Sequence, residues 1–130
     1  MKFDTMYALA KEKIAPLRLN SRVKVGSAVC VLESASGKVY CGKNLVAACG
    51  LGYCAEQGAM MEMLNRGESV IKTMLILDHD GMLLPPCGKC LELITQLGEK
   101  NRDAIVLLGE GRIVTVKELY PLDWKEIKES

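Results

Sequence analysis

Two short cysteine motifs constrain the fold of this chain more than any other feature. The first is Cys54-Ala55-Glu56, and the second is Pro86-Cys87-Gly88-Lys89-Cys90. Cys87 and Cys90 are spaced i, i+3, so both sulfurs lie on one face if a helix begins there. Pro86 favours such a beginning because proline presets the backbone for a first helical turn. We therefore expect a helix to begin at each motif, with both N-termini directed at one site.

The residue types of the two motifs suit a zinc ion. Thiolates from Cys54, Cys87 and Cys90 are typical zinc ligands, and three protein ligands leave a fourth tetrahedral position for water. Zinc lowers the pKa of such a water to about 7. Glu56 lies two residues from a ligand, so we expect it to carry protons beside the metal. The dipoles of the two expected helices should lower the pKa values of the thiols.

Other interpretations of the motifs remain open. A closed structural zinc site, as in a non-catalytic zinc-stabilised binding module, needs a fourth ligand. Candidates for that ligand are Cys30, Cys41, Cys49 and His79, but none forms a second close pair with Cys54. A redox pair would need neither Cys54 nor Glu56. Lys89 either offsets the negative charge of the thiolates or is a solvated surface lysine.

Periodicity and turn residues predict an αββαβαββ order in a single domain spanning residues 1–130. This order indicates an α/β layered architecture with a mixed sheet covered by helices. A short helical turn is expected at 117–120, a turn at 109–111, and a charged tail that frays over 125–130. The expected helices span 5–17, 56–65 and 87–97, and the expected strands span 24–33, 37–44, 72–77, 104–108 and 112–116.

Charge and composition narrow the class of partner. The formal net charge is +1 with no basic block, which favours a small-molecule partner over a nucleic acid. Hydrophobic residues make up 49%, so some apolar surface is expected to be buried between subunits. No segment has the apolar length of a membrane span, and the first residues lack the core of a signal peptide. We expect a cytoplasmic protein with reduced cysteines.

Cys54–Glu56 and Pro86–Cys90 match the zinc deaminase signature, and the chain resembles the cytidine deaminase family over nearly its whole length. Residues 25–29 are similar to that family's V-G-A-A-L strand, and residues 37–44 to its D-G-x-x-x-x-G-x-N hairpin. The resemblance implies a three-layer α/β/α domain with a five-stranded mixed sheet, in a homotetramer whose subunits complete one another's sites. It also implies zinc-dependent hydrolytic removal of the exocyclic amine from a cytosine-type nucleoside or a related amino-heterocycle, releasing ammonia. The implied roles are zinc ligands for Cys54, Cys87 and Cys90, proton transfer for Glu56, a ring contact for Ala55 and a sugar contact for Asn44.

Several positions depart from the family pattern near the substrate. Val46 stands where an acidic residue usually binds the ribose hydroxyl, and Val23 where a phenylalanine commonly stacks. Gln57 replaces an arginine, and the loop from Asn44 to Cys54 is one residue short. These features resemble the blasticidin S deaminase branch, whose substrate is a cytosine nucleoside analogue with an altered sugar. Trp124 could stack on a heterocycle or pack at a subunit interface.

Overall fold

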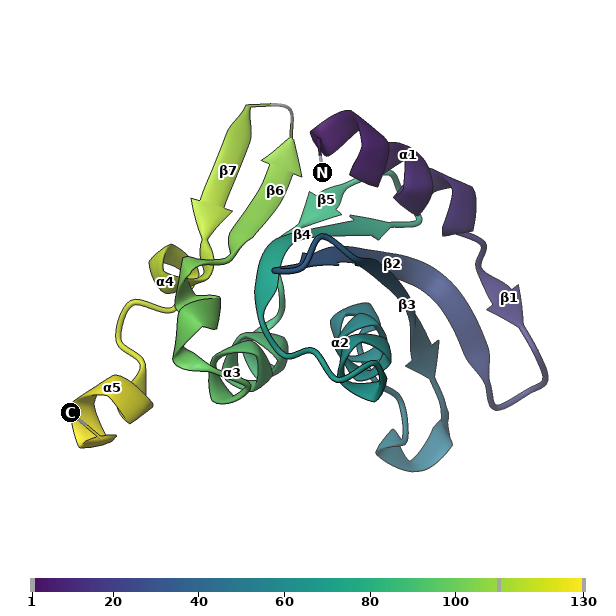
Figure 1. Cartoon of the computed structure of the whole chain (residues 1–130). Coiled ribbons are helices and arrows are strands. Elements are labelled where there is room, and N and C mark those ends of the chain that lie inside the picture. Colours follow the sequence, from purple (N-terminus) through teal and green to yellow (C-terminus); the bar gives the residue numbers. More distant parts are fainter. Residues whose placement is uncertain (1, 110, 130) are drawn as a thin grey trace.

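A mixed seven-stranded sheet forms the middle layer of the molecule (Figure 1). The computed structural model describes residues 2–109 and 111–129. The strand order is β1-β2-β4-β6-β7, with β3 paired to β2 and β5 paired to β4. The β4–β6 pair is parallel, whereas the other described pairs are antiparallel. The strands are β1 (Leu17–Arg18), β2 (Lys24–Ser34), β3 (Val39–Val46), β4 (Ile71–Asp78), β5 (Leu83–Leu84), β6 (Ile105–Gly109) and β7 (Arg112–Thr115).

The five longer strands are the five expected from the sequence, so the mixed sheet is confirmed. The count of five is corrected to seven, because β1 and β5 add two residues each to the edges of longer strands. Leu17 pairs with Val25, and Leu83 pairs with Leu77. A two-residue strand is too short to show an alternating pattern, so only its tertiary pairing defines it.

Helices cover both faces of the sheet, which confirms the three layers (Figure 1). Helix α1 (Phe3–Lys13) buries Met6 and Ala10 against one face, and α2 (Ala55–Asn65) buries Met60 and Met63 against the other. Helix α3 (Gly88–Gln96) packs on the same side as α2 through the buried Ile94. The remaining helical segments are η1 (Ala48–Gly50), η2 (Glu99–Asp103), α4 (Val116–Leu119) and α5 (Trp124–Glu129).

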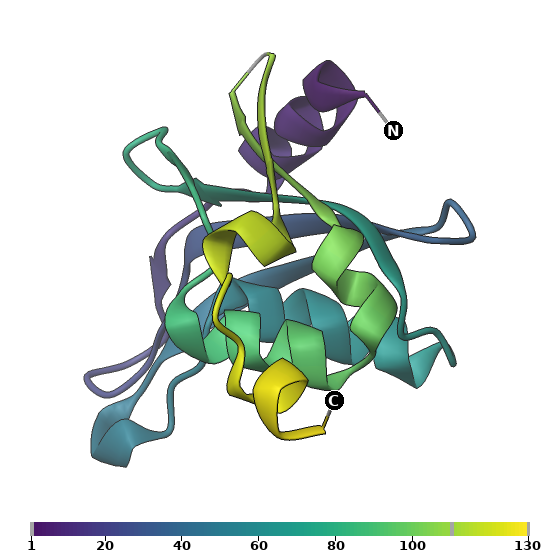
Figure 2. The same cartoon turned by 90° about the vertical axis from the view of Figure 1, so that its left-hand side faces the viewer.

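The end of the first helix and the structure of the C-terminal tail differ from the expectation. The first helix ends at Lys13 rather than at residue 17, since Ile14 is already extended and Leu17 pairs with the sheet. The expected fraying tail is instead α5, which lies against α3 (Figure 2). Its Lys125 is only 7% exposed and forms ion pairs with Glu92 and Asp123. Glu110, in the expected 109–111 turn, and Ser130 lie outside the described residues.

Within the described part of the chain, every helix falls short of the length and apolar character that a membrane span requires.

Candidate metal centre and substrate pocket

The beginnings of α2 and α3 meet at the cysteine motifs. Cys54 is the extended residue before α2, and Cys87 is the extended residue before α3. The ligand atoms of Cys54, Glu56, Cys87 and Cys90 all lie within 4.8 Å of one another. The sulfurs of Cys54 and Cys87 are 3.3 Å apart. The two motifs therefore form one cluster, as their residue types predict.

A close approach between β3 and α2 sets the position of the first motif. A Cβ atom on Gly42 would lie 2.1 Å from the backbone nitrogen of Ala59 and 2.5 Å from the carbonyl oxygen of Ala55. Gly58 faces Gly42 from the helix, where a Cβ atom would be 3.2 Å from the Gly42 Cα. Because no side chain separates the two backbones, the first turn of α2 is held directly on the sheet.

Hydrogen bonds orient the residues of the cluster. The Gln57 side-chain oxygen accepts from the Cys54 backbone N–H at 3.0 Å, which closes the turn that leads into α2. Glu56 is 5% exposed, and its Oε2 accepts from the Cys87 backbone N–H at 3.2 Å. The carboxylate on α2 is thus held by the beginning of α3. The sequence carried no signal for this contact, which joins residues far apart in the chain.

Burial and charge act on two of the thiols, Cys54 and Cys90. Burial, followed by the hydrogen bond with Cys87, raises the pKa of Cys54. Burial, followed by the negative charge of Glu56, raises the pKa of Cys90 far above its ordinary value. Burial and neighbouring acidic groups therefore oppose ionisation of the Cys54 and Cys90 thiols.

The donor set fits zinc. Thiolates are soft ligands that zinc prefers, and a bound metal would compensate for the cost of ionising the half-buried Cys54 and the buried Cys90. The suggested fourth ligands of a closed site do not join the cluster: within residues 2–109 and 111–129, it contains only the four residues of the two motifs. The described cysteines, moreover, form no disulfide. The cluster thus combines three thiols with one carboxylate.

A cavity of about 530 Å³ opens beside the cluster. Cys54, Ala55, Glu56 and Cys87 line it, whereas Cys90 is completely buried. Val46 also lines the cavity, but Val23 is not among its described lining residues. The rest of the lining comprises Ala28, Asn44, Leu45, Ala47, Gly50, Gly52, Tyr53, Ile76, Leu84, Pro85 and Lys89.

Asn44 is held in one orientation at the wall of this cavity. Its Oδ1 accepts from the Ala28 backbone N–H at 2.9 Å, and its Nδ2 donates to the Ser27 hydroxyl at 2.7 Å. Sequence analysis missed the role of Ser27. The one available signal was a serine in the strand that resembles V-G-A-A-L.

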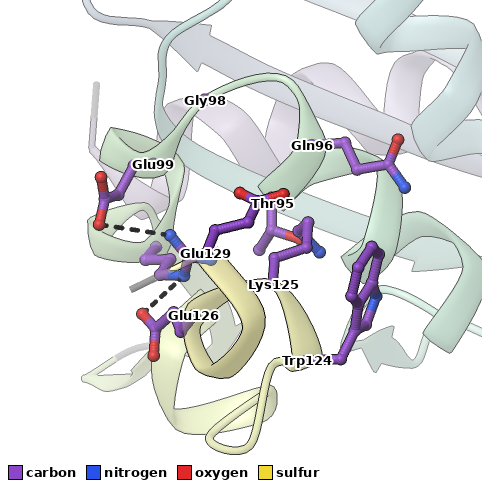
Figure 3. A pocket seen from close by; sticks show the side chains of 9 residues that line it. Thr95, Gln96, Gly98, Glu99, Trp124, Lys125, Glu126 and Glu129 are labelled. Carbon is purple, nitrogen blue, oxygen red and sulfur yellow. Dashed lines mark ion pairs between the residues drawn. The ribbon is translucent and has the colours of Figure 1, made fainter.

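A larger cavity of about 740 Å³ lies at the C-terminal end and contains no residue of the cysteine motifs (Figure 3). Arg102 pairs there with Glu99 and Glu126. Trp124 lines this cavity, and its indole N–H donates to Glu92 at 2.9 Å. Within one chain, Trp124 is therefore not part of the cavity beside the cysteines. We place the candidate site at the smaller cavity, because the residues of the cysteine motifs line it and do not line the larger one.

Fold and site together define a metal-binding α/β/α protein in which two helix beginnings meet at a cysteine cluster. The family model for the cytidine and deoxycytidylate deaminase zinc-binding region matches residues 3–107. The chain belongs to this family and carries its zinc-binding region.

Solved structures of bacterial proteins share the fold. The cytidine deaminase from Mycobacterium leprae has 22% identity and a TM-score of 0.76, with 93% of this chain and 98% of that chain covered. The Mycobacterium tuberculosis cytidine deaminase has 20% identity and a TM-score of 0.76, with coverage of 95% and 98%. The Burkholderia pseudomallei cytidine deaminase has 23% identity and a TM-score of 0.72, with coverage of 92% and 96%.

Proposed function

We propose that this chain is a zinc-dependent hydrolytic deaminase that removes the exocyclic amine of a cytosine-type nucleoside or a related amino-heterocycle. The observation that carries the proposal is the buried Glu56 carboxylate within a cluster of three thiols at the wall of a cavity. In this proposal Cys54, Cys87 and Cys90 hold zinc. The bound metal would supply a Lewis acid and an activated water.

Glu56 is placed to carry the protons of the reaction. The hydrogen bond from the Cys87 backbone N–H occupies one acceptor site of the carboxylate, which has others. We assign to it the removal of a proton from the attacking water and its delivery to the ring nitrogen. The same carboxylate then transfers the remaining proton of the added hydroxyl to the amine, so that the ring carbon becomes a carbonyl and the amine leaves as ammonia. The backbone at Ala55 would contact the ring, and Asn44 would contact the sugar or its replacement.

A modified cytosine nucleoside of the blasticidin S type is the second substrate that we consider. Its support is Val46, which is 52% exposed and brings an apolar side chain to the cavity. A ribose hydroxyl at that wall would lack the acidic partner that nucleoside deaminases of this family use, and unpaired polar groups weaken binding.

The proposal extends to the oligomeric state, the location and the substrate class of the enzyme. We propose a homotetramer of single-domain chains that acts in the cytoplasm, in nucleoside metabolism, on a small molecule rather than on nucleic acid. The near-neutral charge supports the small-molecule substrate, and the names of the proteins with similar folds support a nucleoside.

Replacement of Glu56 by glutamine tests the assigned chemistry. Zinc content should stay near one per chain, whereas the rate of ammonia release should fall by a factor of about 100 or more, because the proton carrier is lost. Cys90→Ser should instead lower the zinc content, measured by elemental analysis. Unchanged turnover in Glu56→Gln would refute the role of Glu56. Zinc binding without ammonia release from any of cytosine, cytidine, deoxycytidine and blasticidin S would favour a non-catalytic zinc module.

A further inference from the structure

The two helices at the cysteine cluster hold the cysteines that precede them in different ways. The backbone N–H of each of these cysteines lies outside the regular hydrogen bonds of its helix. The Cys87 N–H donates across the site to Glu56 of α2 at 3.2 Å. The Cys54 N–H donates within its own helix, to the side-chain oxygen of Gln57 at 3.0 Å. The position of Cys54 therefore depends on a residue that the proposed chemistry does not use.

Cys54 and Gln57 form a capping box, the reciprocal pairing of the residue before a helix with the third residue of that helix. The Gln57 backbone N–H also donates to the Cys54 carbonyl oxygen at 3.1 Å. Gln57 thus contacts both backbone polar groups of Cys54. Because the rotamers open to a side chain depend on its backbone angles, these contacts restrict the direction of the Cys54 sulfur.

The direction of the Cys54 sulfur matters because the cluster draws unequally on the two helices. Cys87 and Cys90 both come from the beginning of α3, whereas Cys54 is the single thiol at the beginning of α2. A displaced Cys54 therefore has no second thiol on its own helix to replace it. The Gln57 side chain is a neutral amide, so its effect on a metal at this cluster is geometric rather than a matter of charge.

We propose that Gln57 is a positioning residue that holds Cys54 in place for zinc and thereby sets how tightly the site retains the ion. The inference rests on the proposed role of Cys54 as a zinc ligand and deepens the proposed function. Residues that orient metal ligands typically change metal affinity by 10–100-fold when they are lost. A helix cap with no effect on the metal would change only the stability of the fold.

A second capping box in the chain supplies the matched control. Glu118, the third residue of α4, accepts from the Thr115 backbone N–H at 3.0 Å, and neither residue belongs to the metal cluster. Gln57→Met and Glu118→Met each remove the acceptor and keep a side chain of similar length. Both should lower the thermal midpoint of the metal-free protein. Only Gln57→Met should raise the zinc dissociation constant, by about tenfold, measured by competition with a chelator.

Substitution of Co²⁺ for zinc reports the arrangement of the ligands, because the visible absorption of Co²⁺ depends on its coordination geometry. Gln57→Met should change this spectrum. Gln57→Glu keeps an acceptor oxygen at the same side-chain length, so it should give the wild-type spectrum. Gln57→Asn retains the amide but shortens the side chain by one methylene, so it should weaken zinc binding as Gln57→Met does.

Wild-type zinc affinity in Gln57→Met, together with a thermal midpoint lowered as in Glu118→Met, would overturn the inference and leave Gln57 as a helix cap alone. Cys54→Ala should lose zinc affinity. If Cys54→Ala bound zinc as tightly as the wild type, Cys54 would not be a ligand, and the inference would fall with that assignment. These measurements use metal binding and not turnover, so a failure of Gln57 as a positioning residue is distinct from a failure of the proposed deamination.

Discussion

Among single residues, Glu92 of α3 joins the C-terminal segment to the body of the molecule. Its carboxylate accepts hydrogen bonds from the Tyr120 hydroxyl at 2.8 Å, the Trp124 indole at 2.9 Å and the Lys125 ammonium. The Lys125 contact is the largest cause that lowers the pKa of Glu92 to about 2. One carboxylate thus holds a segment that the sequence, read as a charged tail, predicted to fray.

The contacts of Glu92 should make the stability of the fold depend on pH in the acid range. Its folded pKa lies below the value of about 4.3 for an unpaired glutamate, so its contacts stabilise the fold above that pH. The stabilisation should disappear as the pH falls from about 5 toward 2. Glu92→Gln should reduce the pH dependence of the thermal midpoint in this range, measured by circular dichroism. The control Glu12→Gln, at an exposed position in α1, should keep the pH dependence of the wild type. If the thermal midpoint of Glu92→Gln changed with pH as steeply as that of the wild type, the proposed role of Glu92 would be contradicted.

At the scale of elements, the contact between β3 and α2 connects stability with the site. Gly42→Ala would place a methyl group against the backbone of α2, where no flexible side chain can move aside. We expect a loss of about 1–3 kcal/mol in the free energy of unfolding and lower deaminase activity, because α2 carries Glu56. Gly98→Ala is the matched control, since a Cβ atom there meets open space. Denaturant titration should show a change of at most about 0.5 kcal/mol for this control. If Gly42→Ala were as stable as the control, α2 would be able to shift away from β3 without a loss in the free energy of unfolding.

At the scale of the whole molecule, apolar side chains remain exposed near the C-terminus. Leu122 is 80% exposed and Ile127 is 70% exposed, beside the half-exposed Trp124. Surfaces of this kind are commonly buried between subunits. In the proposed homotetramer, light scattering should give four times the chain mass of 14.2 kDa. A monomer with full activity would contradict subunit completion of the site.

The sequence by itself determined the donor set and the main elements, because both depend on local spacing. A cysteine pair at i, i+3 and a glutamate beside a third cysteine specify their chemistry within a few residues. The periodic patterns likewise located the five longer strands and the helices that begin near Cys54 and Cys87.

Only the tertiary structure decided how that chemistry is oriented and what faces it. The contacts of Glu56 with Cys87 and of Asn44 with Ser27 join different elements, so no local pattern encodes them. Burial, also a tertiary property, raises the pKa values of the Cys54 and Cys90 thiols. Lys89 was visible in the sequence, but its place in the cavity was not. Local spacing determines which groups are available, whereas packing between distant segments determines their environment and their partners.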